Sequence, residues 1–237
     1  MRRPRRNRSF ASPGTIRFLA QACLVIGVIG TIAGLGYAIN GATQAKGYVV
    51  VPVAARTGAV LEAPGDAADG AEATRLLPVD DAHRRAVRLE IPGAAAGNWL
   101  EAHADALTLR SWGSTVAEQL FNRGGVAVLG LCAGVGALLL RRLLLSVAEG
   151  RPFAPGNAAR LAGIAGLTLV GSLASDFLPA VGANLVLRRV GLAGADSPIF
   201  ADFTLSLAPL LVAPLLLALA EAFRRGTELA QDAEGLI

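Results

Sequence analysis

The 237-residue chain is poor in residue types on which most enzymes and secreted domains depend. It has two cysteines, two histidines and 5% aromatic residues, and 17% of its residues are charged, whereas soluble domains carry about 25%. Both cysteines, Cys23 and Cys132, lie inside apolar stretches, so we expect no disulfide in an outer segment. The sequence lacks a phosphate-binding glycine loop, a zinc-protease helix and a serine nucleophile elbow. We therefore expect neither an enzyme nor a bound cofactor.

Long apolar stretches are what the chain has in abundance. The hydrocarbon core of a bilayer is about 30 Å thick, so a helix rising about 1.5 Å per residue crosses it with about 20 residues. Four stretches approach or reach that length: 18–39, 124–145, 161–178 and 203–220. The sequence therefore predicts an all-α membrane protein, a bundle of four transmembrane helices.

Segregated charge predicts the orientation of these spans. Residues 1–17 contain six arginines and no acid, and residues 146–160 carry Arg151 and Arg160 against Glu149. Positive charge beside a span stays cytoplasmic, so we expect both termini, the turn at 146–160 and the tail at 221–237 to be cytoplasmic. Residues 179–202 would form an outer loop. The basic N-terminus is interpreted as a topology determinant before an uncleaved anchor, and no direct nucleic-acid binding is expected.

The segment 40–123 is too long for a simple connection and predicts a small β-containing extracytoplasmic insertion between the first two spans. Tyr48–Val53, Ala86–Ile91 and Ala106–Trp112 have the apolar or alternating pattern of strands. Pro52 should confine the first of them to a sheet edge or a strand end. Ser114 is the expected N-cap of the helix that leads into the second span.

Small residues predict how the spans pack. Gly30 and Gly34 in the first span, and Gly130 and Gly134 in the second, are each four residues apart and so share a helix face. Such faces let two helices approach closely in lipid. We expect a compact bundle, with the glycine-free fourth span kinked at Pro214.

The turn between the second and third spans is the most patterned polar segment. Gly150 is suited to a left-handed helix C-cap, and Asn157 is suited to capping the first turn of the next helix. Phe153 would then be presented at the membrane surface as an anchor or a partner contact. Helix capping alone would also explain these residues, so both interpretations stay open.

This turn, the segment Glu221–Leu229 and the ending Glu234–Ile237 resemble a family of bacterial integral membrane proteins known as domain of unknown function 2975. Members have four spans, a Gly-x-Pro-Phe turn followed by Asn and Arg-Leu, and a Phe-Arg-x-Gly tail. The resemblance implies the bacterial cytoplasmic (inner) membrane. It also implies a small helix-turn-helix regulator as a partner, because members are often encoded beside one. It supplies no catalytic residues.

Several charged residues are candidates for function. Glu221 should pair with Arg224 and Arg225 three and four residues along the same helix. The candidates for contact with a partner come from the turn and the tail: Phe153, Asn157, Arg160, Glu221, Arg224 and Arg225.

Asp176 is an acid inside the third span, where charge is costly and often functional. It could couple proton or ion movement, or it could be an interfacial residue paired with Arg188 or Arg189.

A metal site in the insertion is a weaker possibility. Glu101, His103 and Asp105 would share one face of a strand, and Asp80, Asp81 and His83 form a second small group. Nothing in either group enforces the geometry of a metal centre, and acids with histidine are ordinary on solvated loops, so no metal is predicted.

The preferred functional hypothesis is a non-enzymatic sensor or regulatory membrane subunit that contacts a cytoplasmic partner. One alternative is a small transporter or ion-coupled permease that uses Asp176 and forms a homo-oligomer. Another is a structural assembly factor held by its glycine faces.

Overall fold

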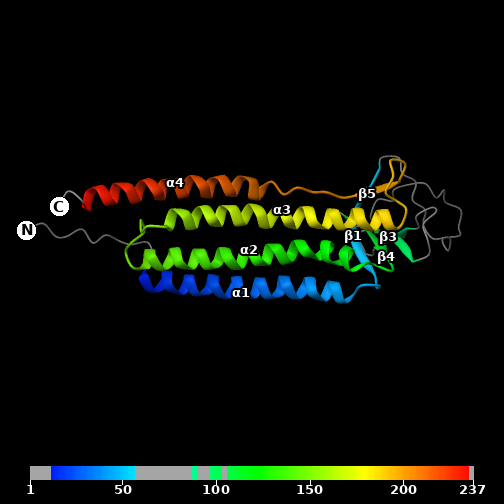
Figure 1. The fold of residues 1–237 in the computed structure, drawn as a ribbon, viewed down its shortest axis with the longest axis horizontal. Helices are drawn as coiled ribbons and strands as arrows, with labels where there is room; N and C mark the ends of the chain where they lie inside the picture. Colours follow the sequence, from blue (N-terminus) through cyan, green and yellow to red (C-terminus); the bar gives the residue numbers. More distant parts are fainter. Residues whose placement is uncertain (1–11, 57–86, 90–96, 103–105, 235–237) are drawn as a thin grey trace, which may run out of the picture. The chain divides into compact units, whose positions relative to one another are not determined.

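The computed structural model describes residues 12–56, 87–89, 97–102 and 106–234. The chain divides into two compact units. One, here the helical unit, comprises Met1–Ala33, Leu129–Ser172 and Ser206–Ile237. The other, here the sheet unit, comprises Gly34–Val128 and Leu173–Leu205. The described residues form four helices and a small sheet, and the colours of Figure 1 show where each element lies in the sequence.

The helices are α1 (Pro13–Thr43), α2 (Val116–Ala148), α3 (Asn157–Arg189) and α4 (Ala208–Glu234). The first three are long and apolar enough to cross a membrane, and no other described helix meets that criterion. Pro13 is suited to the first turn of α1, because a backbone N–H at that position has no partner within the helix. Ser12 caps this turn, since its Oγ accepts a hydrogen bond from the Thr15 backbone N–H at 3.2 Å. The chain is a multi-pass membrane protein with three candidate spans.

The fourth stretch differs from the expected continuous span at 203–220. Helix α4 begins only at Ala208, and residues 203–207 are not helical. Pro209 lies in the first turn of α4, the position where a helix tolerates a residue without an N–H. The apolar part of α4, Ala208–Ala220, is about 20 Å long, shorter than the bilayer core of about 30 Å.

Within the helical unit, α1 and α2 lie side by side (Figure 1), and small residues meet between them. A Cβ added at Gly134 would overlap Thr31 Oγ1, and one added at Gly27 would overlap the Cβ of Ala137. The Thr31 hydroxyl lies 2.9 Å from both the Gly27 and the Gly130 carbonyl oxygens. A Cβ at Gly30 would meet nothing within 4 Å. The contact face of α1 is therefore centred on Gly27 and Thr31.

The other helix contacts of this unit are also close. A Cβ at Gly171 of α3 would lie 3.1 Å from the Cβ of Cys132 in α2. Leu143, Leu161 and Ala220 form a buried cluster that joins α2, α3 and α4.

The described residues of the sheet unit form five antiparallel strands in the order β2-β3-β4-β1-β5. Four of them lie between α1 and α2: β1 (Val49–Ala55), β2 (Val87–Leu89), β3 (Asn98–Ala102) and β4 (Leu107–Ser111). This confirms a small sheet in the insertion. The fifth, β5 (Ile199–Ala201), comes from the connection between α3 and α4, which was expected to be a loop.

The core of the sheet unit lies between one face of the sheet and the end of α3. Val49, Val51 and Val53 alternate inward along β1 and are at most 2% exposed. They pack with Leu100, Leu109 and Ile199 of the sheet and with Ala183, Val186 and Leu187 of α3. The last turns of α3 thus pack into a hydrophobic core of the kind found between a helix and a sheet in soluble domains.

The expected edge position of Pro52 is wrong, because β1 pairs with β4 on one side and with β5 on the other. The Pro52 carbonyl accepts from the Asp202 N–H at 3.3 Å, just beyond the end of β5. In an antiparallel strand the N–H and C=O of a residue face the same neighbour. The side of Pro52 that lacks an N–H therefore points past the end of β5, and not toward one of its residues.

Candidate functional site

The end of α2 has the geometry expected from its sequence. Gly150 has φ +77°, which confirms the left-handed C-cap. Its N–H donates to the Val147 carbonyl at 3.0 Å, and the Arg151 N–H donates to the Ser146 carbonyl at 2.9 Å. Together these two bonds form a Schellman motif, which satisfies the last carbonyls of the helix.

Asn157 is fully buried, but it does not make the expected cap. Its Nδ2 donates to Ser146 Oγ at 2.7 Å and to the Pro152 carbonyl at 2.9 Å. Its Oδ1 accepts from Arg160 Nη1 at 2.6 Å instead of from a backbone N–H. Asn157 therefore ties the last turn of α2 to the connecting turn and the start of α3.

The turn also closes on the tail of α4. The Phe153 ring lies 5.6 Å from the Phe223 ring, centroid to centroid. A Cβ at Gly226 would lie only 2.5 Å from the Phe153 ring, so a glycine is required for this close approach. Thr227 Oγ1 donates to the Phe153 carbonyl at 3.1 Å. The two polar motifs of the sequence thus form one surface, here called the turn–tail site (Gly150–Asn157 with Phe223–Gln231).

A cavity of about 320 Å³ lies at the turn–tail site. Phe153 lines it and is 44% exposed, although its ring and its carbonyl are both held by α4. The remaining lining residues are Gly150, Arg151, Pro152, Ala154, Pro155, Thr227, Ala230 and Gln231.

Charged side chains form a ladder on the tail next to this site. The expected pairing is present: Glu221 Oε1 lies 2.8 Å from Arg224 Nη2 and 2.9 Å from Arg225 Nε. Arg224 also pairs with Glu228. Hydrogen bonds from Arg224 and then Arg225 lower the pKa of Glu221 from 4.5 to about 2. The Glu221 carboxylate raises the pKa of Arg224 further above its usual range.

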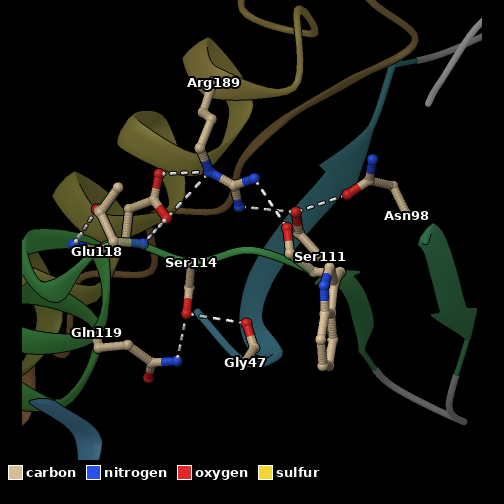
Figure 2. A network of polar contacts seen from close by, with 9 residues as sticks. Gly47, Asn98, Ser111, Ser114, Glu118, Gln119 and Arg189 are labelled. Atoms are coloured by element: carbon tan, nitrogen blue, oxygen red, sulfur yellow. Dashed lines mark hydrogen bonds and ion pairs between the residues drawn. The ribbon is translucent and has the colours of Figure 1, made fainter. Parts of the chain in front are cut away.

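A second polar cluster lies in the sheet unit around Arg189, which the sequence offered together with Arg188 as a possible partner of Asp176. Arg189 pairs with Glu118 in the first turn of α2, Nε to Oε1 at 2.8 Å (Figure 2). Arg189 also donates through Nη2 to Ser111 Oγ at 2.8 Å and through Nη1 to the Trp112 carbonyl at 2.9 Å. The Glu118 side chain is only 3% exposed. Sequence reasoning missed this pairing because the two residues lie on different helices.

The same cluster corrects the N-cap of α2. Thr115, and not Ser114, forms the cap: Thr115 Oγ1 accepts from the Glu118 N–H at 3.2 Å, and Glu118 Oε2 accepts from the Thr115 N–H at 2.9 Å. This is a capping box. Ser114 Oγ donates to the Gly47 carbonyl at 3.0 Å and lies 2.9 Å from Gln119 Nε2 (Figure 2). The start of α2 is thereby joined to the chain just beyond α1.

The remaining candidates are Asp176 and the residues considered for a metal site. Asp176 is half-buried in α3. Glu101 contacts Trp99 Nε1 at 3.1 Å and Arg110 Nε at 3.5 Å, while Asp80, Asp81, His83, His103 and Asp105 lie outside the described residues. Within the described parts of the chain, no group of three His, Cys, Asp or Glu could hold a metal ion.

Comparison with known proteins places this chain in a family. No curated protein and no solved structure matches it. A family model described as "Protein of unknown function (DUF2975)" matches residues 106–237, more than half of the chain. The matched region contains β4, β5, three of the helices, the turn–tail site and the Arg189–Glu118 pair. Together with its three candidate spans, this match shows that the chain is a membrane protein belonging to the DUF2975 family.

Proposed function

We propose that the protein is a non-enzymatic regulatory subunit of the bacterial cytoplasmic membrane, and that its turn–tail site binds a cytoplasmic partner. The observation that carries this proposal is that Phe153 is exposed and yet held in a fixed position. Its ring is 44% exposed, yet the Thr227 hydrogen bond and the contact with Gly226 hold it in place. A large aromatic side chain that is fixed before binding loses little entropy on association, as is typical of interface hot spots.

The chemistry around Phe153 suits a protein partner. Pro152 and Pro155 stiffen the turn, and the cavity beside it combines apolar surface with the polar groups of Thr227 and Gln231. The side chains of Arg224 and Arg225, on the tail next to this site, are more than half exposed. A partner with an apolar anchor and an acidic rim would fit this surface. The family resemblance favours a small helix-turn-helix regulator.

The contacts within each unit also support a fourth crossing of the membrane. β5 pairs with β1, so residues 199–201 lie on the side where α1 ends. The tail contacts the turn that follows α2, and that turn lies at the opposite end of a candidate span. We propose that residues 203–220 cross the membrane in between. The extended residues 203–207 add about 16 Å to the apolar part of α4, and Phe203 packs on Phe177 of α3 at 6.3 Å between centroids.

In this topology the turn–tail site is cytoplasmic and the insertion between α1 and α2 is extracytoplasmic. Arg17, Arg141 and Arg142 then flank the cytoplasmic ends of the first two spans, as the positive-inside rule requires.

Affinity capture from native membranes tests the proposal, with the wild type compared with Phe153→Ala and Gly226→Ala. Phe177→Ala is the matched control, because Phe177 is also an exposed aromatic residue, at 57%, but lies in the sheet unit. We expect a stoichiometric soluble partner that both turn–tail variants lose and the control retains. Equal capture by all four proteins, or no partner with any of them, would contradict the proposal.

The second candidate function is ion-coupled transport by a homo-oligomer. The observation in its favour is the half-buried Asp176 within a candidate span. Proton or solute flux in liposomes that Asp176→Asn abolishes and Asp202→Asn leaves unchanged would support it. A structural assembly role is less favoured, because the Gly27 and Gly134 faces already contact each other within this chain.

A further inference from the structure

Three aromatic side chains gather on the surface of the sheet unit. The Tyr48 ring lies 4.5 Å from the Trp112 ring and 5.2 Å from the Trp99 ring, centroid to centroid, both in edge-on geometry. Tyr48 is 42% exposed and Trp112 is 54% exposed, and neither belongs to the buried core of the sheet. Aromatic residues that pack together and yet remain this exposed indicate a partner at their outer face.

The position of these residues in the chain indicates which partner that is. Tyr48 follows α1, which ends at Thr43, and Trp112 precedes α2, which begins at Val116. The Lys46 N–H donates to the Ser114 carbonyl at 2.7 Å, and the Ser114 N–H donates to the Gly47 carbonyl at 3.1 Å. The two aromatic residues therefore stand together where the chain leaves two candidate spans.

The polar and apolar groups near these helix ends place a membrane boundary beside the aromatic pair. Arg123 Nη2 donates to Gln44 Oε1, just beyond α1, at 2.8 Å, and its guanidinium lies 4.9 Å from the Tyr37 ring centre. An arginine that reaches toward the helix ends in this way is snorkelling. Ile39 and Leu120, one on each helix, are exposed and apolar at 64% and 49%.

The backbone around the aromatic pair is firmly held. The Trp112 carbonyl accepts from Arg189 at 2.9 Å, and its N–H donates to the Gly97 carbonyl at 3.3 Å. Gly97 and Gly113 have φ values of +92° and +76°, which favour glycine on either side of this contact. Gln119 Nε2 donates to the Tyr48 carbonyl at 2.9 Å. The Arg189–Glu118 cluster thus fixes the surface that presents both rings.

We propose that Tyr48 and Trp112 form a docking surface for the phospholipid headgroup layer, and that this surface sets the depth of α1 and α2 in the bilayer. Tryptophan and tyrosine favour this layer because their rings are apolar and their N–H or O–H groups remain hydrated or bonded to lipid oxygens. Lys46, the one lysine in the sequence, is exposed beside them and supplies a cation for lipid phosphate.

The sequence allows a direct test, because its two tryptophans are both in this cluster. The full-length Trp99→Phe variant carries Trp112 as its sole tryptophan, and Trp112→Phe is the matched reporter of Trp99. Both are reconstituted in phosphatidylglycerol–phosphatidylethanolamine vesicles that contain lipid with a nitroxide on the headgroup, or with a nitroxide deep in the acyl chain. Aqueous acrylamide is the third quencher, and circular dichroism checks folding.

We expect the headgroup nitroxide to remove most of the Trp112 emission, with weaker quenching by the deep nitroxide and by acrylamide. Tyr48→Ala on the Trp99→Phe background should weaken the headgroup quenching, because Trp112 loses the ring against which it packs. Quenching by acrylamide alone would show a surface in water, and the deep nitroxide acting most strongly would show a buried span. Protection from all three quenchers would show a cover of protein, such as a second copy. Each of these three results would overturn the proposal.

Discussion

Arg189, the last residue of α3, donates from Nε to both carboxylate oxygens of Glu118, at 2.8 and 3.1 Å. One guanidinium thereby joins the end of α3 to the first turn of α2, and its other two nitrogens bond the end of the sheet. Glu118 is almost completely buried, while the Arg189 side chain remains 27% exposed. This pair therefore ties two helices and the sheet together within the sheet unit.

Removing the arginine should destabilise the protein, because it leaves a buried carboxylate without its partner. We expect Arg189→Ala to cost about 3 kcal/mol, at the low end for a buried pair because Arg189 is partly exposed. Thermal unfolding in detergent measures this cost. The control is Arg188→Ala, which removes a neighbouring exposed arginine and should change the melting temperature little. Equal melting temperatures for the two variants would contradict the role assigned to Arg189.

Gly134 should tolerate alanine much less well than Gly30 does. A Cβ at Gly134 would displace the Thr31 hydroxyl, whereas a Cβ at Gly30 meets no neighbour within 4 Å. Overpacking of this kind costs about 1–3 kcal/mol, so Gly134→Ala should unfold at a lower temperature or denaturant concentration. Gly30→Ala should behave like the wild type. The α1–α2 contact described above would be wrong if Gly30→Ala were the more damaging change.

The Thr31 hydroxyl should contribute a measurable interhelical hydrogen bond. Thr31→Val keeps the shape of the side chain but removes the bond to Gly130 of α2. Such bonds in membranes average about 0.6 kcal/mol, and we expect a loss of that size in free energy of unfolding. Thr168→Val is the matched control, because the Thr168 hydroxyl bonds only the Ile164 carbonyl of its own helix. If Thr31→Val lowered the free energy of unfolding no more than Thr168→Val does, the interhelical role of Thr31 would be contradicted.

Gly226→Ala should open the turn–tail site without unfolding the protein. The added methyl would occupy the space of the Phe153 ring, and that ring is exposed enough to swing away. We expect faster amide hydrogen exchange across residues 150–157 and little change in melting temperature. Gly166→Ala adds a methyl in open space and serves as the control. Unchanged exchange in the turn would show that Gly226 is not needed for the contact.

The tail should become sensitive to acid only at low pH. The pKa of Glu221 in the folded protein is about 2, below its usual 4.5, so the unfolded chain binds more protons between these values. The contribution of the Glu221 pairs is therefore complete above pH 4.5 and is lost as the pH falls through about 2. Hydrogen exchange of α4 over this range should show the loss in the wild type. Glu221→Gln should remove this pH dependence, and an identical profile in the variant would contradict it.

Much of the fold follows from patterns within short segments. The apolar runs predict helices wherever α1, α2 and α3 occur, because a residue's cost in lipid depends mainly on its own side chain. The β-branched apolar run at 48–53 predicts β1, the apolar pattern at 106–112 predicts β4, and Gly150 predicts the end of α2 through its left-handed backbone. The spacing of Glu221 and Arg224 predicts their ion pair, because one helical turn brings them together. These features depend on local geometry alone.

Only the tertiary structure decides which distant segments meet. Ile199–Ala201 forms a strand because it pairs with the free edge of β1. Helix α4 therefore begins only after this strand, at Ala208. Gly27, and not Gly30, faces α2 because side-chain shape on both helices sets their rotation. The pairing of Arg189 with Glu118 and the contact of Phe153 with Gly226 each join residues more than 70 positions apart. The sequence by itself determined the long helices and the strands with a clear local pattern, while packing between distant segments decided where β5 forms and which side chains make up the sites.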